Sequence, residues 1–386
     1  MRMTLRELKI NMAAPKKKKT VSKKKPKKVL KRAKRKPRAL DLHRSRRNPV
    51  ISPAPNSYWE SEAVFNPGAV MHDGRIQLFY SALGPDGISR IGYASRKDGI
   101  HFDKRFPHPV YIPETSAESA RHHPHTSPAR LHYDRALHAA GGGWGGCEDP
   151  RAVKIDGRVY LTFNIFNGWG SIRVGVTSIS EDDLEQGHWN WRRMLFLSPP
   201  NQIHKNWVLF PEKMGDKFAI LHSVSPDVKV DYVEELEDLH TGRIVIQSSR
   251  SDDKTYPHYS WESWIRGTGA PPIKTKYGWL AFYHAMDKND PNRYKLGVLL
   301  LDSKDPRKVL YRSRYPILEP DEWYENDWKP GIIYASGAIV KGDTLFIYYG
   351  GGDKHIGVAY TNLDNFVQKL MKNEHAAFSV KSAKVE

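Results

Sequence analysis

A pair of acidic residues and an arginine stand directly before one of the clearest strand–turn–strand patterns in the chain. The segment reads Glu148-Asp149-Pro150-Arg151. A carboxyl group can donate a proton to a leaving group where burial or a like charge favours its protonated form, and Glu148 could supply such a charge to Asp149. The alternative is that Asp149 orders a turn and pairs with Arg151. Residue spacing leaves both interpretations open.

Polar and aromatic groups flank other strand patterns in the same way. Lys205, next to His204, would suit an anion because both side chains can donate hydrogen bonds to it. Trp261 and Trp264 could stack on sugar rings, and Asp353 follows a glycine run that would let a ligand approach the backbone. Each has a structural alternative, namely a solvated lysine, a core tryptophan or a turn aspartate.

The elements that would position these groups recur along the chain. A turn pair followed by an alternating, aromatic-ended strand occurs about every 60 to 80 residues, which is typical of a repeat fold. The turn pairs are Asp73-Gly74, Asp156-Gly157, Gly215-Asp216, Tyr277-Gly278 and Gly342-Asp343. A second small-residue strand follows in four copies, and RIVIQSS from Arg243 is the best candidate in the third.

Five such copies predict an all-β fold of half-buried strands, a five-bladed β-propeller. A β-sandwich would explain the strands but not the recurrence of the phrase. We expect the propeller to span residues 48–375, with a tail at 376–386 and one apolar helix face near 362–372. Residues 103–146, rich in His, Pro and Gly, predict a loop, and their histidines fit a polar loop better than a metal site.

All of the net charge of +18 lies in the N-terminal segment. Residues 1–47 hold 21 of the 61 Lys and Arg residues and 2 of the 43 Asp and Glu, so the remainder has 40 basic and 41 acidic residues. A self-repelling segment of this kind should be disordered. It could bind RNA, DNA or anionic lipid non-specifically through phosphate contacts, or it could serve only as a solubilising extension.

The cysteine content and the hydropathy restrict the setting. The single cysteine, Cys147, cannot form an internal disulfide, which fits a reducing compartment. There is no apolar run of membrane-span length and no apolar segment behind the basic N-terminus, so we expect a soluble, cytoplasmic protein. Phosphate-binding loops, dinucleotide fingerprints, nucleophile elbows and two-cysteine metal motifs are also missing from the sequence.

With these segments assembled, the chain resembles the β-mannoside phosphorylases and β-mannosidases of glycoside hydrolase family 130. The resemblance extends from about residue 47 to 362. It rests on the order of seven motifs: RNPV, VFNPGAV, SRIGYASRKDGIHF, GCEDPRAVKIDGRVYLTF, KNWVLFPEK, GTGAPPIKTKYGWLAFYH and YYGGGDKHIGVA. The family fold is a five-bladed propeller, in agreement with the repeat.

The resemblance implies a single inverting displacement on a terminal β-mannoside, without a metal or an organic cofactor. Asp149 would donate the proton through the mannosyl 3-hydroxyl, and inorganic phosphate would attack from the opposite face to give α-mannose 1-phosphate. By position, the phosphate subsite would contain Lys205, His284 and Tyr294. The residues that would bind the sugar are Asn66, Arg90, Glu148, Arg151 and Asp353.

Two positions differ from the family pattern. Where its phosphorylases generally have arginine, this chain has Ser81 and Ser223. Fewer cations would bind phosphate less well, since a charge-assisted hydrogen bond contributes roughly 1.5–3 kcal/mol. An inverting β-mannoside hydrolase and a non-catalytic sugar-binding propeller therefore stay as alternatives. The sequence leaves open the linkage, the acceptor sugar and whether the chain forms a homo-oligomer.

Overall fold

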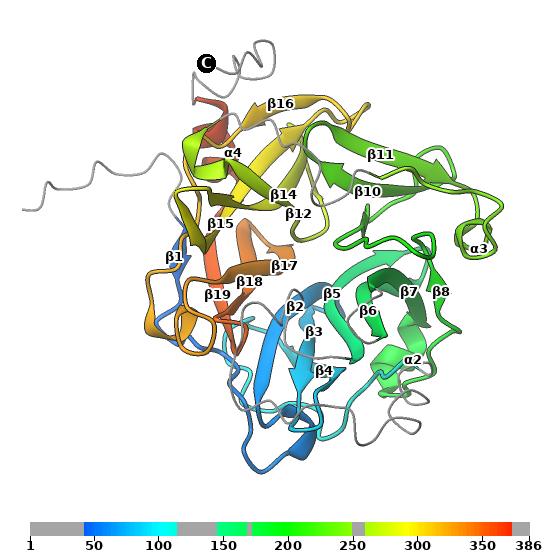
Figure 1. Cartoon of the computed structure of the whole chain (residues 1–386), viewed down its shortest axis with the longest axis vertical. Helices are drawn as coiled ribbons and strands as arrows, with labels where there is room; N and C mark the ends of the chain where they lie inside the picture. Colours follow the sequence, from blue (N-terminus) through cyan, green and yellow to red (C-terminus); the bar gives the residue numbers. More distant parts are fainter. Residues whose placement is uncertain (1–41, 114–144, 168–171, 249–258, 373–386) are drawn as a thin grey trace, which may run out of the picture. The chain divides into compact units, whose positions relative to one another are not determined.

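The computed structural model describes residues 42–113, 145–167, 172–248 and 259–372. Most of the predicted N-terminal tail, most of the 103–146 loop with its histidines, and the 376–386 tail lie outside these ranges. Within these ranges the strands form four sheets with few helices between them (Figure 1). The seven-stranded sheet contains two antiparallel units joined by a short parallel pairing of Ile88 with Gly145 and Ser89 with Gly146, and each other sheet is one unit, so five antiparallel units follow one another along the chain. The folded part is therefore mostly β.

The five units follow the order of the chain. The first contains β2 Ala63–His72, β3 Arg75–Leu83 and β4 Ile88–Arg96. The second contains β5 Gly145–Ile155, β6 Arg158–Asn167, β7 Ile172–Ser180 and β8 Leu195–Phe196. The third contains β9 Val208–Leu209, β10 Phe218–Val224 and β11 Val228–Val233. The fourth contains β12 Trp264–Thr268, β13 Ile273–Thr275, β14 Gly278–Asp287, β15 Asp290–Leu301 and β16 Val309–Arg312. The fifth contains β17 Ile333–Lys341, β18 Thr344–Gly351, β19 His355–Asn362 and β1 His43–Arg44.

The helices are short. They are α2 Glu181–Gln186, α3 Leu236–His240 and α4 Leu363–Met371, with 3-10 turns η1 Tyr58–Glu60, η2 Ser260–Glu262 and η3 Trp323–Glu325. α4 confirms the C-terminal helix predicted near 362–372, and it buries Phe366, Val367 and Leu370. No helix in the described ranges is long and apolar enough to cross a membrane.

The five predicted hairpin strands are confirmed as β3, β6, β10, β14 and β18. Asp73 and Gly74 show why the turn pairs matter: their φ angles of 46° and 63° are the positive values that a tight hairpin turn requires. The position predicted for the second strand of the third unit, at residues 243–249, was wrong. β11 begins at Val228 instead, while residues 244–248 form no strand and leave Ile244 and Val245 exposed.

The central strands are buried on both faces rather than half-buried. Neighbouring residues of one strand point into different hydrophobic clusters, and each cluster joins two units. The clusters join β3 with β6 (Phe79, Leu161), β7 with β10 (Val176, Ile220), β10 with β14 (Leu221, Ala281), β14 with β18 (Phe282, Ile347) and β18 with β3 (Tyr348, Leu78). Each unit therefore packs on two others, and the fifth packs on the first.

The first strands of the units also approach one another closely. A Cβ added at Gly68 of β2 would lie 2.6 Å from the carbonyl oxygen of Pro150 in β5, and one added at Gly337 of β17 would lie 2.5 Å from that of Pro67. A side chain at either glycine would collide with a neighbouring backbone. These glycines let β2 pack between β5 and β17.

The N-terminal strand β1 completes the fifth unit by pairing with β19 (Figure 1). Arg44 of β1 donates from Nε to Glu325 at 2.7 Å, and Glu325 is fully buried. Ser45 is also buried. The folded part thus includes residues 42–47, so the boundary predicted at residue 48 was wrong by six residues.

The Arg44–Glu325 pair belongs to a repeated triad. In three units a 3-10 turn carries a buried glutamate that accepts from a tyrosine of the next hairpin and pairs with an arginine of an outer segment. The triads are Glu60 with Tyr80 and Arg105, Glu262 with Tyr283 and Arg312, and Glu325 with Tyr349 and Arg44. A buried charge needs such partners, so each triad fixes its 3-10 turn to its sheet.

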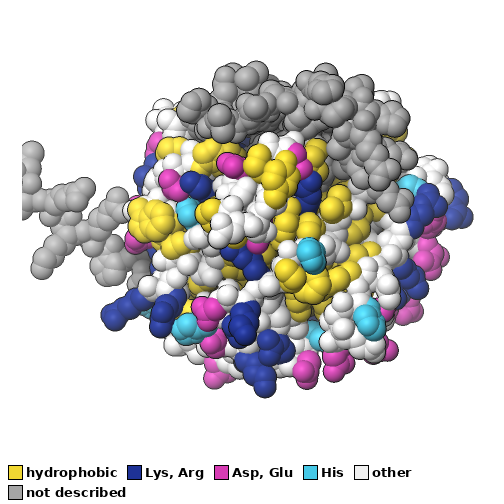
Figure 2. All heavy atoms as spheres, turned by 90° about the horizontal axis from the view of Figure 1, so that it is seen from below, with side chains coloured by type: hydrophobic (Ala, Val, Ile, Leu, Met, Phe, Trp, Pro, Cys, Tyr) yellow, Lys and Arg dark blue, Asp and Glu magenta, His cyan; other side chains and the backbone are white. Residues whose placement is uncertain are grey.

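Outside the tail, charges of both signs are mixed. Figure 2 shows Lys and Arg side chains interspersed with Asp and Glu over the face that it draws, apart from the atoms drawn in grey. This mixture agrees with the near balance of 40 basic and 41 acidic residues after residue 47.

Candidate active site

Asp149 lies within β5, not ahead of the second unit as the sequence suggested. The pairing of β5 with β6 shifts register between Glu148 and Arg151, which marks a bulge. Asp149 has a φ of 55°, in the left-handed region that Asp and Asn tolerate better than most residues. Its side chain is 8% exposed. The bulge takes Asp149 out of the ladder and frees its side chain to meet neighbouring strands.

Three side chains hold Asp149 in this position. Asn66 of β2 donates from Nδ2 to one carboxylate oxygen at 2.7 Å, and Asn164 of β6 donates to the other at 2.9 Å. The backbone N–H of Asp149 donates to Oγ of Ser81 in β3 at 2.8 Å. Backbone and carboxylate are thus both fixed, which is the arrangement expected of a preorganised reactive group.

The guanidinium of Arg151 makes all of its hydrogen bonds to groups within the protein. It is 1% exposed and donates to the backbone oxygens of Asp149 (2.8 Å) and Gly269 (3.1 Å), to Asn206 Oδ1 (2.9 Å) and to the Tyr334 hydroxyl (3.0 Å). All three nitrogens therefore have protein acceptors. This geometry favours a positioning role over the direct sugar contact that the resemblance implied.

Three cations gather near the acid pair. Burial is the largest effect on Lys205 and lowers its pKa, while the charges of Asp149 and Glu148 raise that pKa and those of Arg266 and Lys329 lower it. Charges that interact measurably lie close together, because solvent and salt screen distant ones. The site therefore combines carboxylates with cations, as an anion-binding reaction centre requires.

Tyr294, a predicted phosphate ligand, lies in the same region. Its hydroxyl accepts from Nε of Arg266 at 2.9 Å, and its ring is 6.4 Å from that of Tyr334. The Arg266 guanidinium covers the ring of Trp264 at 4.4 Å, so one face of this predicted sugar platform is already occupied. Arg266 joins the candidate phosphate ligands.

His284, the third predicted phosphate ligand, is completely buried. Its Nε2 accepts the backbone N–H of Ala335 at 2.9 Å, and its ring stacks on Tyr334 at 4.1 Å. Burial, together with the charge of Arg151, lowers the pKa of His284 to about 3. The ring is therefore neutral at pH 7 with its proton on Nδ1, so it would bind phosphate by a hydrogen bond and not by charge.

Asp353 faces the same group of charges. Its carboxylate is 2.8 Å from Nζ of Lys329, and both side chains are buried. Burial raises the pKa of Asp353, and the charge of Asp149 raises it further, whereas Lys329 and Lys205 lower it. Asp353 has a φ of 50°, so a second acid of this site also occupies left-handed backbone.

Glu148 and Arg90 have protein partners beside β5. Glu148 is fully buried and accepts from Oγ of Ser89, the residue that precedes Arg90 in β4. Arg90 is held by both carboxylate oxygens of Asp86. Sugar binding by Glu148 and Arg90 stays a prediction.

The sequence match decides the family. Residues 138–373 match the family 130 glycoside hydrolase profile, which is described as β-1,4-mannooligosaccharide phosphorylase. This match covers well over half of the chain. The chain belongs to glycoside hydrolase family 130. The resemblance drawn from the seven motifs is thereby confirmed.

Curated family 130 enzymes are similar over most of their length. A 1,2-β-oligomannan phosphorylase of Thermoanaerobacter sp. (strain X514) is 36% identical over 329 residues, covering 83% of this chain and 97% of that enzyme. A β-1,2-mannobiose phosphorylase of the same strain is 34% identical, covering 82% and 96%.

Solved structures share the fold. A glycosyl hydrolase from Bacteroides ovatus aligns with a TM-score of 0.64 at 22% identity, covering 84% of this chain and 94% of that one. The β-1,2-mannobiose phosphorylase from Listeria innocua aligns with a TM-score of 0.61 at 21% identity, covering 86% and 99%.

The two serines that depart from the family 130 pattern have structural partners. Ser81 is fully buried and receives the Asp149 N–H. Ser223 is buried in β10, where its hydroxyl donates to the backbone oxygen of Ser225 at 2.9 Å. An arginine at position 81 would remove the hydrogen bond that supports the backbone of Asp149.

Trp261 has the core position that the sequence left open as the alternative to stacking on sugar. Its side chain is 7% exposed, packs on Tyr283 in the core of the fourth unit, and donates from Nε1 to the backbone oxygen of Arg314 at 3.0 Å. Its role is therefore structural.

Several residues of the site escaped the sequence analysis, namely Asn164, Asn206, Tyr334 and Lys329. One signal could have revealed part of the arrangement. Asn66-Pro67-Gly68-Ala69 of β2 and Asp149-Pro150-Arg151-Ala152 of β5 share the pattern Asn/Asp-Pro-x-Ala, and each has a left-handed residue at a bulge. Asn206, just before β9, is left-handed as well.

The part of the chain that the structure describes has no group of three or more His, Cys, Asp or Glu side chains that could hold a metal ion. Charged nitrogen donors gather near Asp149 instead, and they suit an anion.

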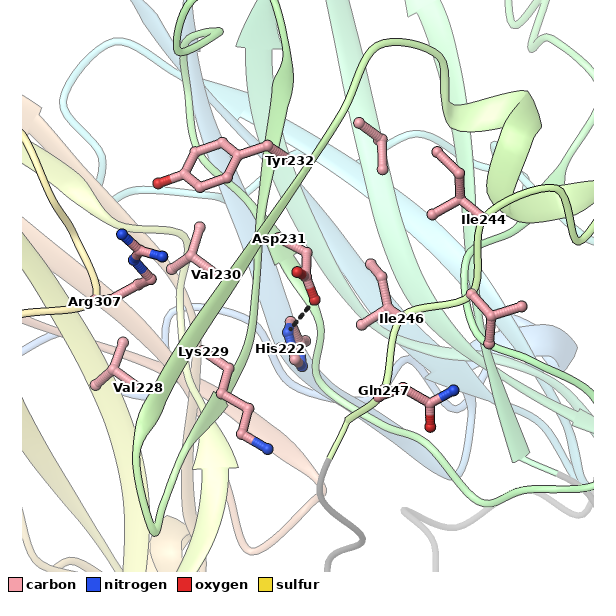
Figure 3. Close-up of a pocket in the computed structure, with 12 residues that line it drawn as sticks. His222, Val228, Lys229, Val230, Asp231, Tyr232, Ile244, Ile246, Gln247 and Arg307 are labelled. Carbon is pink, nitrogen blue, oxygen red and sulfur yellow. Dashed lines mark ion pairs between the residues drawn. The ribbon is translucent and has the colours of Figure 1, made fainter.

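An open pocket of about 430 Å³ lies away from these residues, along β11 (Figure 3). Its walls are β11, residues 244–247 and Arg307, and it contains the contact of His222 Nε2 with the carboxylate of Asp231 at 2.9 Å. Burial lowers the pKa of His222 to about 4. None of the predicted site residues lines this pocket.

Proposed function

We propose that this chain is an inverting β-mannoside phosphorylase. A phosphate oxygen bonds to the anomeric carbon of a terminal β-mannosyl group while the bond from that carbon to the glycosidic oxygen breaks. The products are α-mannose 1-phosphate and the shortened sugar, whose oxygen receives a proton that originates from Asp149. The reaction is reversible because no high-energy bond is lost.

One observation carries the proposal: a buried, preorganised carboxylate shares its site with several cations. Asp149 is fixed by Asn66, Asn164 and Ser81, and its charge acts on Lys205. A phosphate dianion is bound by such cations, since charge-assisted hydrogen bonds are about twice as strong as neutral ones. The relatives named as phosphorylases support the same reaction.

In the proposed site, phosphate is bound by Lys205 and Arg266, with Tyr294 and neutral His284 as further donors. The hydrogen bond from Arg266 to Tyr294 supports the addition of Arg266 to this set. The proposed sugar-binding residues are still Asn66, Asp353, Arg90 and Glu148. Arg151 is proposed to position the site without contacting the sugar.

We also propose a β-1,2 linkage for the substrate. The two Thermoanaerobacter enzymes align with this chain over nearly their whole length, and both are named for β-1,2-linked mannosides. The family description, by contrast, names a β-1,4-mannooligosaccharide phosphorylase. Turnover of β-1,2-mannobiose and β-1,4-mannobiose, each at equal concentration with phosphate, tests the choice. Faster release from the β-1,4 sugar would contradict it.

Hydrolysis is the second candidate, and one observation favours it. His284 is neutral, and Ser81 and Ser223 stand where arginines would add charge, so the phosphate subsite has fewer cations than the family pattern. Sugar release with and without phosphate separates the two reactions. Equal release in both conditions would establish the hydrolase.

For the architecture, we propose a five-bladed β-propeller formed by residues 42–372. Its support is the cyclic packing of the units: five clusters join neighbouring units, and the fifth unit packs on the first. In such a fold the first strands surround a central pocket, and Asn66 of β2, Asp149 of β5 and Asn206 just before β9 would then face it.

For the basic segment, we propose non-specific binding of polyanions. Removing residues 1–41 should leave turnover intact and abolish salt-sensitive retention on heparin, because contacts to a charged backbone weaken steeply with salt. Retention by the truncated chain would show that the folded part binds polyanions itself.

A further inference from the structure

A chain of hydrogen bonds runs from the carboxylate of Asp149 to the buried guanidinium of Arg151. Asn164 donates from Nδ2 to Asp149 at 2.9 Å, and the same Nδ2 lies 3.2 Å from Oδ1 of Asn206. Asn206 Oδ1 in turn accepts from Arg151 at 2.9 Å. The exposed fractions are 1% for Asn164 and Arg151 and 6% for Asn206, so these bonds are shielded from water.

The neighbours of each amide determine its orientation. Asn164 Oδ1 accepts the backbone N–H of Asn206 at 3.0 Å, a group that can only donate. The NH₂ group of Asn164 must therefore face Asp149. Asn206 Oδ1 faces two donors, so its amide is oriented as well. Arg151 and Asn164 are therefore the donors of the chain, and Asn206 Oδ1 and the Asp149 carboxylate are its acceptors.

Asn206 is anchored from a second side. Its backbone oxygen accepts from the hydroxyl of Thr268 in the fourth unit, and its φ is 65°. Tyr334 of the fifth unit accepts from Arg151 at 3.0 Å. The position of the Asp149 carboxylate thus depends on contacts with several units, while its neighbours in β5 alone would leave it free to rotate.

We propose that Asn164 and Asn206 are positioning residues, which fix the carboxylate of Asp149 so that its acid proton points at the substrate. The inference rests on the proposed role of Asp149 as proton donor. An amide N–H occupies one lone pair on each carboxylate oxygen, from Asn66 and from Asn164, which leaves a defined direction on each oxygen for the proton. Misplacement of a reactive group by about 1 Å can cost on the order of 100-fold in rate.

The test compares two substitutions at Asn164 with a matched control. Asn164→Ala removes the donor and should lower kcat about 10- to 100-fold, with the KM for β-mannobiose within twofold of the wild type. Asn164→Asp places a second carboxylate against Asp149. Because like charges disfavour ionisation, the alkaline limb of the kcat pH profile, where the acid loses its proton, should move upward by about one pH unit or more.

Thr162→Val is the control. Thr162 is buried two residues away in β6, and its hydroxyl donates to the backbone oxygen of Trp207 at 3.0 Å, next to Asn206. The variant loses a buried hydrogen bond between the same two segments without touching Asp149. It should lower the melting temperature and leave the pH profile in place. A profile that moves equally in Thr162→Val would reduce Asn164 to an ordinary structural residue.

A second readout does not need the substrate. With ¹³C-labelled aspartate, the carboxyl signal that disappears in Asp149→Asn reports the titration of Asp149 directly. In Asn164→Asp its midpoint should move upward in the folded protein. An unmoved midpoint would overturn the positioning role, whether or not the wild type turns over β-mannosides. An inactive wild type with a shifted midpoint would instead contradict only the proposed function.

Discussion

The ammonium group of Lys329 lies 2.8 Å from the carboxylate of Asp353, and each side chain is more than nine-tenths buried. Replacing Lys329 by Met would leave a buried carboxylate without its cation, and breaking such a pair typically costs about 3–5 kcal/mol. We expect the free energy of unfolding, measured by urea denaturation, to fall by that amount. Lys354→Met, at a partly exposed pair with Asp327, should change it by less than about 1 kcal/mol.

Asp149→Asn tests the acid itself. Asparagine tolerates left-handed backbone and keeps the shape of the side chain, so the fold should survive. Loss of a general acid typically lowers kcat by about 10²- to 10⁴-fold. The control is Asp156→Asn, on the exposed turn between β5 and β6, which should keep wild-type kcat. Wild-type turnover in Asp149→Asn would remove Asp149 from the mechanism.

Lys205→Met tests the phosphate subsite. Loss of one charge-assisted hydrogen bond costs roughly 1.5–3 kcal/mol, which corresponds to a rise of about 10- to 100-fold in the KM for phosphate. The KM for the sugar should change far less. Lys154→Met removes a lysine that is exposed in β5 and should leave both values unchanged. An equal rise for both substrates in Lys205→Met would place Lys205 outside the subsite.

Buried neutral histidines predict acid sensitivity. Burial lowers the pKa of His284 to about 3 and that of His222 to about 4. Between about pH 6.5 and these values the unfolded chain binds a proton that the folded chain does not, so stability falls as pH decreases, by at most about 1.4 kcal/mol per pH unit for each group. Urea denaturation between pH 7 and 5 measures the slope. His284→Gln should reduce it relative to the wild type, while replacement of the exposed His188 should not.

Local patterns made the hairpins predictable. Turn pairs such as Asp73-Gly74 and the alternation that follows them act within a few residues, and all five strands were found where the sequence placed them. Non-local pairing was not predictable in this way. β1 pairs with β19 at the other end of the chain, so its two residues were assigned to the tail.

The burial of the strands shows the same limit. The alternation of residues suggested that one face of each strand would be exposed to solvent. Phe79 and its neighbour Leu78 nevertheless both pack into hydrophobic clusters, because other sheets cover both faces of β3. The proton-donor role proposed for Asp149 came from the family resemblance, because residue type and spacing alone left that role open. Its supports, Asn164 and Asn206, come from other segments with no shared motif, so only the three-dimensional arrangement identifies them.

The most direct measurement is ³¹P NMR of the protein mixed with β-1,2-mannobiose and inorganic phosphate. We expect α-mannose 1-phosphate, formed in equal amount to the mannose released, and no mannose release when phosphate is omitted. Mannose release at the same rate without phosphate, with no phosphate ester in either sample, would contradict it.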